Sequence, residues 1–305
     1  MSIYTFLKEN TGFETDCKLP DHDDLGLQDG QTWVPGAYEG IVMRSTYSIR
    51  RPAAMNYFLA KKVARQIKKP SDKNREAEET AVRKAGALAT VDSLISFITK
   101  FGTDKALVRK EALRLCTECD KREPVKVGIG LLGSFGEPED AEIIETLGRH
   151  EEFTFYACPA LKALLGEDSY NDAVLALARE TDGWGKLAAI YELDFGRDYV
   201  KDFLLRDGCR NRLGNEEAAN LCATKGKLIF RLREMAQADN APLEDDFRGI
   251  CDILDGLTAY DGQHDSLNDY KYGAEVPHLW KELLEKFPSL EETDSRAGRI
   301  LQKMR

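Results

Sequence analysis

Two cysteines stand at the spacing that zinc sites and redox centres use, in the run Cys116-Thr117-Glu118-Cys119. A structural zinc ion needs four ligands, and the remaining cysteines of the chain are single and far apart. The pair also ends an expected helix outside any β–α–β unit, which disfavours a thioredoxin-like role. Asp21-His22-Asp23-Asp24 offers possible ligands, but four consecutive side chains point in different directions. We therefore expect no metal site and no cofactor.

No set of nucleophile, base and acid stands out either. The chain has 4 histidines, and their spacing from serines and aspartates carries no signal of a catalytic triad. We assign no catalytic residue and favour a non-enzymatic protein. The 7 cysteines are odd in number and scattered through expected helices, which is typical of reduced, packed thiols. The first residues lack a basic stretch followed by a long apolar run, so we expect a cytoplasmic protein.

A basic block lies next to an acidic one. Residues 41–75 contain ten basic residues and a single acid, whereas residues 1–40 contain two basic residues and eight acids. Five basic side chains surround the apolar face of an expected helix over 53–69: Lys61, Lys62, Arg65, Lys68 and Lys69. They could hold the phosphates of nucleic acid or another anionic surface. We favour the alternative, a solvated face paired with the acidic N-terminus or with nearby glutamates, because the net charge of the chain is −10.

Helical spacing of apolar residues dominates the chain, and almost no stretch alternates with the period of two that strands require. The spacing predicts an all-α protein with helices over 53–69, 76–101, 104–119, 215–237, 242–258 and 277–287. Residues 1–40 are expected to form an irregular extension packed on the first helices, and residues 261–266 a loop. A short tail or helix is expected over 291–305.

Three glycines, Gly136, Gly166 and Gly196, recur at intervals of thirty residues, and the residues around them repeat in register. Apolar residues stand one, five and nine positions before each glycine, and seven and eight positions after it. This pattern predicts two helices per copy, joined by a glycine turn, over about 124–207. Such pairs bury their apolar stripes only by stacking. If Gly166 has the positive φ of a helix end, Gly166→Val should cost about 1 kcal/mol or more.

Around the first glycine, the run from Leu131 to Ala141 resembles the helix–turn–helix junction of HEAT-like, armadillo-type repeats, where an apolar helix end meets glycine, an acid and proline. Weaker copies surround Gly166 and Gly196, and Arg197 replaces the acid in the third. The resemblance implies an α-solenoid, a superhelix of stacked antiparallel helix pairs, over about 41–290. It specifies a scaffold and not a chemistry.

Two enzymatic relatives of that architecture fit the chain poorly. His150-Glu151 resembles one of the several His–Glu pairs of helical-repeat iron hydroxylases, but a two-iron site cannot be built from one such pair. Trp184 with Asp182 and Tyr191 is similar to the aromatic and acidic set of helical-repeat DNA glycosylases. The alternative function that we retain is nucleic-acid binding or glycosylase-like activity that uses the basic segment 44–75.

The second helix of each copy is expected to line the concave face of the stack, where partners dock. Acids outnumber bases on these three helices, so the face should attract a basic protein segment and repel phosphates. The candidate partner-binding residues are Glu142, Glu145, Arg149, Asp172, Arg179 and Lys201. The sequence thus predicts a scaffold that binds a protein or peptide of basic character, with neither nucleic acid nor a membrane as its partner.

Overall fold

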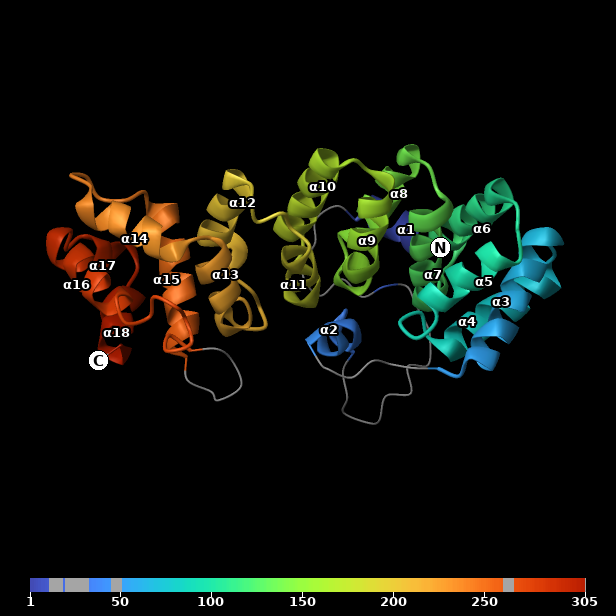
Figure 1. Ribbon diagram of the computed structural model, residues 1–305, viewed down its shortest axis with the longest axis horizontal. Helices are drawn as coiled ribbons and strands as arrows, with labels where there is room; N and C mark the ends of the chain where they lie inside the picture. The colour runs from blue at the N-terminus through green and yellow to red at the C-terminus, as the bar shows by residue number, and fades with distance from the viewer. Residues whose placement is uncertain (11–18, 20–32, 45–50, 260–265, 305) are drawn as a thin grey trace. The chain divides into compact units, whose positions relative to one another are not determined.

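A computed structural model describes residues 1–10, 19, 33–44, 51–259 and 266–304 (Figure 1). Within these residues every regular element is a helix, so the prediction of an all-α protein is confirmed. The chain divides into two compact units, Met1–Glu192 and Leu193–Arg305. Among the described helices, none is both long and apolar enough to cross a membrane.

Eleven α-helices form the first unit. They are α1 (Ile3–Glu9), α2 (Ala37–Arg44), α3 (Ala53–Lys68), α4 (Asp72–Ala85), α5 (Val91–Lys100), α6 (Lys105–Glu118), α7 (Arg122–Phe135), α8 (Ala141–Gly148), α9 (Glu151–Leu164), α10 (Glu167–Glu180) and α11 (Gly183–Tyr191). A single 3₁₀ turn, η1 (Pro138–Asp140), leads into α8.

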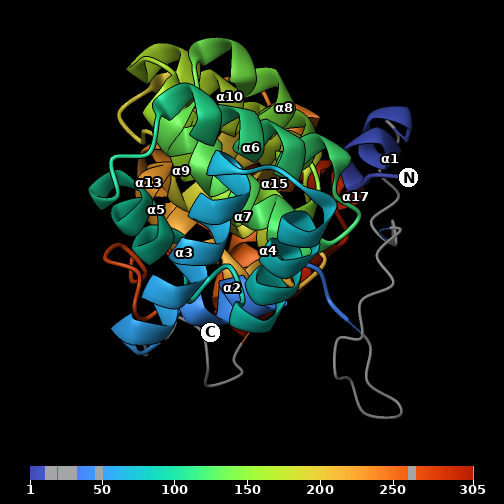
Figure 2. The same cartoon turned by 90° about the vertical axis from the view of Figure 1, so that its right-hand side faces the viewer.

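The helices of the first unit pack in a regular order. Extensive contacts join α6 to α7, α8 to α9 and α10 to α11. In addition α7 packs on α9 and α9 on α11, while α6 packs on α8 and α8 on α10. The sequence predicted that the helices before and after Gly136, α7 and α8, pack as a pair. Instead α7 packs on α6 and α9 and has few contacts with α8. Two further helices cover the unit: α1 lies on α6 and α8, and α2 lies on α9 and α11. Figure 2, turned by 90° from Figure 1, shows α3 and α4, which contact each other, facing the viewer.

The second unit holds shorter helices. They are α12 (Asp198–Phe203), continued by the π-helical turn η2 (Leu204–Gly208), the 3₁₀ turn η3 (Asn215–Glu217), α13 (Ala219–Lys225), α14 (Leu228–Gln237), α15 (Glu244–Thr258), α16 (Val276–Lys286), α17 (Leu290–Thr293) and α18 (Arg296–Lys303). At its centre α15 contacts η2, α13 and α18, and the fully buried rings of Phe247 and Trp280 stack 5.2 Å apart. Apolar packing around α15 holds this unit together.

The predicted helices over 53–69, 104–119, 242–258 and 277–287 are confirmed within one or two residues. Two predictions were wrong. The helix expected over 76–101 is two helices, because Gly86 ends α4 with a φ of +74°. The helix expected over 215–237 is also divided, because Lys227 has a φ of +65° between α13 and α14. Most of the expected loop 261–266 and of the N-terminal extension lies outside the described residues.

The three periodic glycines lie between helices, as predicted, but none of them has positive φ. Gly166 is the N-cap of α10 with φ −69° and ψ 162°, an extended conformation open to any residue. Glycine is accepted at this position because an N-cap needs no side chain to begin the helix. The expectation that Gly166→Val would strain the backbone was therefore wrong. Gly102, just past α5, does have the left-handed conformation, with φ +59°.

These two glycines allow a matched comparison. A methyl group added to either would have no neighbour within 4 Å, so only the backbone conformation distinguishes them. We expect Gly102→Ala to lower the free energy of unfolding by about 1 kcal/mol, because an L-residue is strained at positive φ. Gly166→Ala should change it by less than about 0.5 kcal/mol. Urea unfolding of the two variants measures the difference, and equal losses would contradict this account.

Candidate functional site

A lysine buried among three carboxylates is the most unusual feature of the first unit. Lys126 of α7 is 1% exposed, and its Nζ lies 2.5 Å from Glu39 Oε1, 2.7 Å from Glu152 Oε1 and 3.0 Å from Glu123 Oε1. Burial alone would lower the pKa of Lys126, but the charges of Glu152, Glu123 and Glu39 raise it well above its ordinary value. The ammonium group is therefore held charged inside the protein.

The pKa values of two of the carboxyl groups, Glu39 and Glu152, shift in opposite directions. Burial raises the pKa of Glu39, a shift that Lys126 only partly offsets. Burial also opposes ionisation of Glu152, yet Lys126 and Arg122, with hydrogen bonds from Lys126 and Trp33, lower its pKa overall. The Tyr156 hydroxyl donates to Glu39 Oε1 at 3.1 Å, while Glu39 Oε2 has no hydrogen-bond partner among the described residues.

This cluster attaches the segment Trp33–Arg44, which includes α2, to α7, α9 and α11. Glu152 Oε2 accepts from Trp33 Nε1 at 2.9 Å and from the Gly36 amide at 3.2 Å. The Arg122 guanidinium lies 4.9 Å from the centre of the Trp33 ring. At Gly40, a side chain would overlap the ring of Trp184, which explains a glycine in the middle of α2. The segment Trp33–Arg44 is therefore bound by specific contacts to the layer of helices α7, α9 and α11.

A hollow borders this segment, and a second hollow adjoins the first. A cavity of about 530 Å³ lies between Trp33, Tyr38 and Glu39 on one side and α4, the 85–89 turn and the start of α7 on the other. Arg83, Lys84 and Arg122 are among its lining residues. A second hollow of about 290 Å³, the apolar groove, is lined by these residues: Ala87, Leu88, Val91, Asp92, Ile95, Gly130, Gly133, Ser134, Phe155, Tyr156, Pro159, Ala160 and Ala163. Leu88 borders both hollows, so together they present a charged end and an apolar end.

Glu39, Glu123 and Glu152 are the one group of acids among the described residues close enough to share a metal ion, with oxygens within 4.8 Å of one another. Lys126 Nζ lies among these oxygens and supplies the positive charge that a metal would bring. The arrangement thus serves as an ion-paired anchor. The six cysteines within the described residues are buried, and burial raises the pKa of Cys116 and Cys119, which makes both poor nucleophiles.

The predicted partner-binding residues do not form one cluster. Glu142 and Glu145 lie on α8 and Arg149 directly after it, and Asp172 and Arg179 lie on α10, which contacts α8. Lys201 lies on α12 in the second unit and pairs with Asp198 at 2.8 Å. On the first unit Arg149 pairs with Glu180 at 2.7 Å. Glu142 and Asp172 are exposed, and the pKa of half-buried Glu145 is raised, chiefly by burial.

The predicted anion-binding residues do share a surface. Lys61, Lys62, Arg65, Lys68 and Lys69 are all exposed on α3 or directly after it. None of the five forms an ion pair with a described residue. The glutamates expected to neutralise them are engaged elsewhere, because Glu78 and Glu79 pair with Arg114 at 2.8 Å and 2.7 Å. The expectation that these two glutamates pair with the basic helix was therefore wrong.

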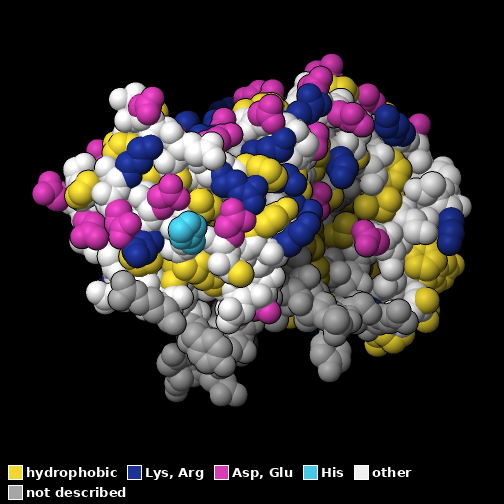
Figure 3. Space-filling view, turned by 60° about the vertical axis from the view of Figure 1, so that its left-hand side comes forward, with side chains coloured by type: hydrophobic (Ala, Val, Ile, Leu, Met, Phe, Trp, Pro, Cys, Tyr) yellow, Lys and Arg dark blue, Asp and Glu magenta, His cyan; other side chains and the backbone are white. Residues whose placement is uncertain are grey.

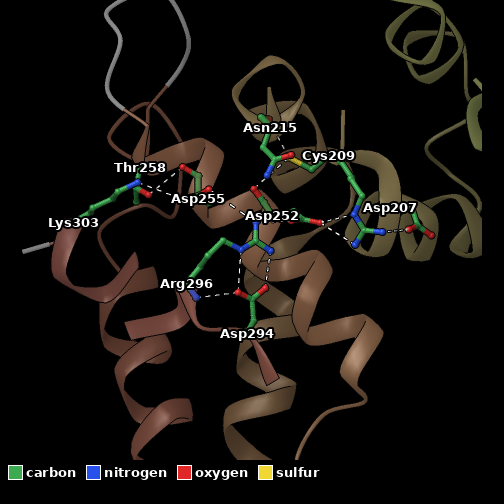
Figure 4. A network of polar contacts seen from close by, with 10 residues as sticks. Asp207, Cys209, Asn215, Asp252, Asp255, Thr258, Asp294, Arg296 and Lys303 are labelled. Atoms are coloured by element: carbon green, nitrogen blue, oxygen red, sulfur yellow. Dashed lines mark hydrogen bonds and ion pairs between the residues drawn. The ribbon is translucent and has the colours of Figure 1, made fainter. Parts of the chain in front are cut away.

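In the second unit, polar contacts join α15 to α18 and to the residues after η2 (Figure 4). Asp252, 4% exposed, binds Arg296 Nη1 at 2.8 Å and Arg210 Nη2 at 3.1 Å. Arg296 also binds Asp294. A hollow of about 220 Å³ beside Lys201, Lys227 and Arg231 is lined by as many acids as bases. Figure 3 shows acidic and basic side chains interspersed on one face. The ion pairs of Asp252 and Arg296 therefore serve to stabilise the second unit.

Sequence reasoning missed Lys126, Glu39, Glu123 and Glu152. The available signal was Lys126 itself, which interrupts the apolar run from Val125 to Leu132. Trp184, considered for its likeness to a glycosylase residue, instead packs against Gly36 and Gly40. Comparison with the known protein families, the curated proteins and the solved structures found no match.

Proposed function

We propose that this protein is a non-enzymatic binding scaffold whose first unit is a HEAT-like stack of helix pairs, cytoplasmic in location, that holds a segment of a partner protein. The order of packing supports the stack, because successive pairs α6/α7, α8/α9 and α10/α11 contact one another through both of their helices. Stacked pairs leave long ridged surfaces that suit extended peptides.

One observation carries the choice of binding surface. The layer of α7, α9 and α11 already binds a short segment of its own chain, Trp33–Arg44, through buried polar contacts and close backbone approach. The cavity begins at the edge of that segment, and the apolar groove adjoins the cavity at Leu88. A partner segment would extend the same mode of recognition into these two hollows.

The lining residues indicate which side chains such a segment would carry. Apolar side chains fit the groove beside Val91, Ile95 and Pro159. At the charged end, Lys126 pairs with Glu39 and Glu123, and the side chains of Arg83 and Lys84 are exposed at the border of the cavity. A segment with an acidic residue next to apolar ones therefore complements the hollows.

A second surface stays a candidate because its charge has the opposite sign. Glu142 on α8 and Asp172 on α10 are exposed on helices that contact each other, and acids outnumber bases there. This face complements a basic segment, as the sequence predicts.

A displayed peptide library tests both surfaces. We expect selected peptides to combine apolar and acidic residues, and to lose at least about tenfold in affinity on Ala163→Trp, which fills the groove. The matched control is Ala176→Trp, an exposed alanine on α10, which should leave affinity unchanged. Arg83→Glu together with Lys84→Glu should weaken binding further, as measured by titration calorimetry.

Basic peptides that are lost on Glu142→Lys with Asp172→Lys, and unaffected by Ala163→Trp, would transfer the function to the α8/α10 face. The proposed scaffold would be contradicted if no selected peptide lost affinity on Ala163→Trp or on Glu142→Lys with Asp172→Lys.

A further inference from the structure

The outward face of α3 is a single stripe that changes character along its length. Met55, Phe58, Lys62, Arg65 and Lys69 follow one another at every third or fourth residue, so they lie on the same side of the helix, and all five are exposed. The opposite face carries the buried residues Leu59, Val63 and Ile67 and contacts α4, α5 and α6.

The apolar end of the stripe is unusually open. Phe58 is 64% exposed and Met55 is 53% exposed, one helical turn apart. Packing brings further aromatic rings beside Phe58. The Tyr57 ring lies 5.9 Å from Phe58, 5.7 Å from Phe97 and 5.8 Å from Phe101, and the last two residues lie in or directly after α5. Lys61 and Lys100 lie over the Tyr57 and Phe97 rings at 4.6 Å and 5.6 Å. Lysine and aromatic groups are therefore interleaved on this surface.

Among the described residues, the basic end has no counter-charge. The sequence of α3 contains no acidic residue. The five basic residues on or directly after α3 form no ion pair with a described residue. The exposed acids of α4, Asp72 and Glu76, form none with them either. A partner with a row of anions would neutralise this end, and a partner with an apolar phase would bury Phe58 and Met55.

We propose that α3 binds the surface of a phospholipid bilayer that carries anionic headgroups, with Phe58 and Met55 inserted among the acyl chains. A bilayer offers both requirements side by side, since its phosphates lie next to a hydrocarbon phase. Nucleic acid offers phosphates and base faces that suit Phe58, but no medium that buries Met55. The inference is independent of the peptide-binding function. It departs from the sequence-based expectation that the protein has no membrane partner.

Sedimentation of the full chain with vesicles tests the proposal. The protein should bind vesicles of phosphatidylcholine with phosphatidylglycerol at low salt and not vesicles of phosphatidylcholine alone. Lys62→Ser with Arg65→Ser should lower the partition coefficient by about twenty-five-fold, at about fivefold per charge. The matched control is Arg83→Ser with Lys84→Ser, which removes the same charge from α4 and should have a smaller effect. Phe58→Ser should weaken binding at constant charge, whereas Phe230→Ser, another exposed phenylalanine, should not.

A second measurement reports insertion directly. Phe58→Trp should add tryptophan fluorescence that shifts to the blue on these vesicles, and Phe230→Trp should add fluorescence that does not shift. Absence of vesicle binding at low salt, or binding that survives both the charge variant and Phe58→Ser, would overturn the proposal. Binding of a single-stranded oligonucleotide that displaces the protein from vesicles and survives Phe58→Ser would also overturn it and assign the stripe to nucleic acid.

Discussion

Lys126→Met is expected to lower the free energy of unfolding of the first unit by about 3–5 kcal/mol, the typical result of breaking a buried ion pair by removing one partner. Methionine keeps much of the length of the side chain, so the loss reports the charge and not a large cavity. Without the ammonium group, Glu39, Glu123 and Glu152 remain close together, and two of them are nearly inaccessible to water. Urea unfolding followed by circular dichroism measures the loss.

The deficit should depend on pH. The folded-state pKa of Glu152 is lowered, so its contribution is present above the ordinary glutamate pKa and is lost as the pH falls through its folded value. Since Lys126 is a main cause of that lowering, the difference between wild type and Lys126→Met should be largest near neutral pH and should narrow in acid. The raised pKa of Glu39 also narrows the difference in acid, because a protonated carboxyl group needs no counter-charge.

The same substitution should release α2. Amide hydrogen exchange over 33–44 should accelerate in Lys126→Met, because Glu39 loses its principal partner. Lys110→Met, at an exposed lysine of α6, serves as the control and should change stability by less than about 0.5 kcal/mol. Equal behaviour of the two variants would show that the buried cluster does not stabilise the unit.

The sequence predicts the helices well where apolar spacing is uninterrupted, as over 53–69 and 242–258. It fails where backbone conformation decides. Gly86 ends α4 at positive φ inside a run that otherwise reads as one helix, and Lys227 does the same between α13 and α14. A lysine at positive φ carries no compositional signal, because the surrounding packing imposes that conformation. The period of thirty residues identified the turns, while the pairing of helices across them required the tertiary contacts.

The candidate site was less accessible to prediction. The basic stripe of α3 could be identified from charge alone, but Phe97 and Phe101 join it only through the packing of α5 on α3. The Lys126 cluster unites residues as far apart in the chain as Glu39 and Glu152. Each of these charges, taken singly, is typical of a solvated helix surface. Burial, which turns them into an anchor for α2, is a property of the assembled layers.

A second buried cluster leads to the other large effect that we expect. Arg114 of α6, 9% exposed, binds Glu78 at 2.8 Å, Glu79 at 2.7 Å and Glu111 at 2.6 Å, and so joins α4 to α6. Arg114→Met should lower the free energy of unfolding by about 3–5 kcal/mol, because Glu78 and Glu111 are left buried without a cation. Urea unfolding at neutral pH measures this loss.

Glu78→Gln provides the decisive comparison within that cluster. Burial, and then the charge of Glu111, raise the pKa of Glu78 well above its ordinary value, so its ionised form is disfavoured despite Arg114. For a raised carboxyl pKa, stability is fully present below the unfolded-state value and is lost as the pH rises through the folded-state value. Glutamine carries no charge to desolvate and keeps an oxygen that can accept from Arg114. Glu78→Gln should therefore cost much less than Arg114→Met, and adding it to Arg114→Met should recover part of the loss. If the two single variants cost the same, or the double variant is no more stable than Arg114→Met, the ionised Glu78 is not what makes the loss of Arg114 expensive.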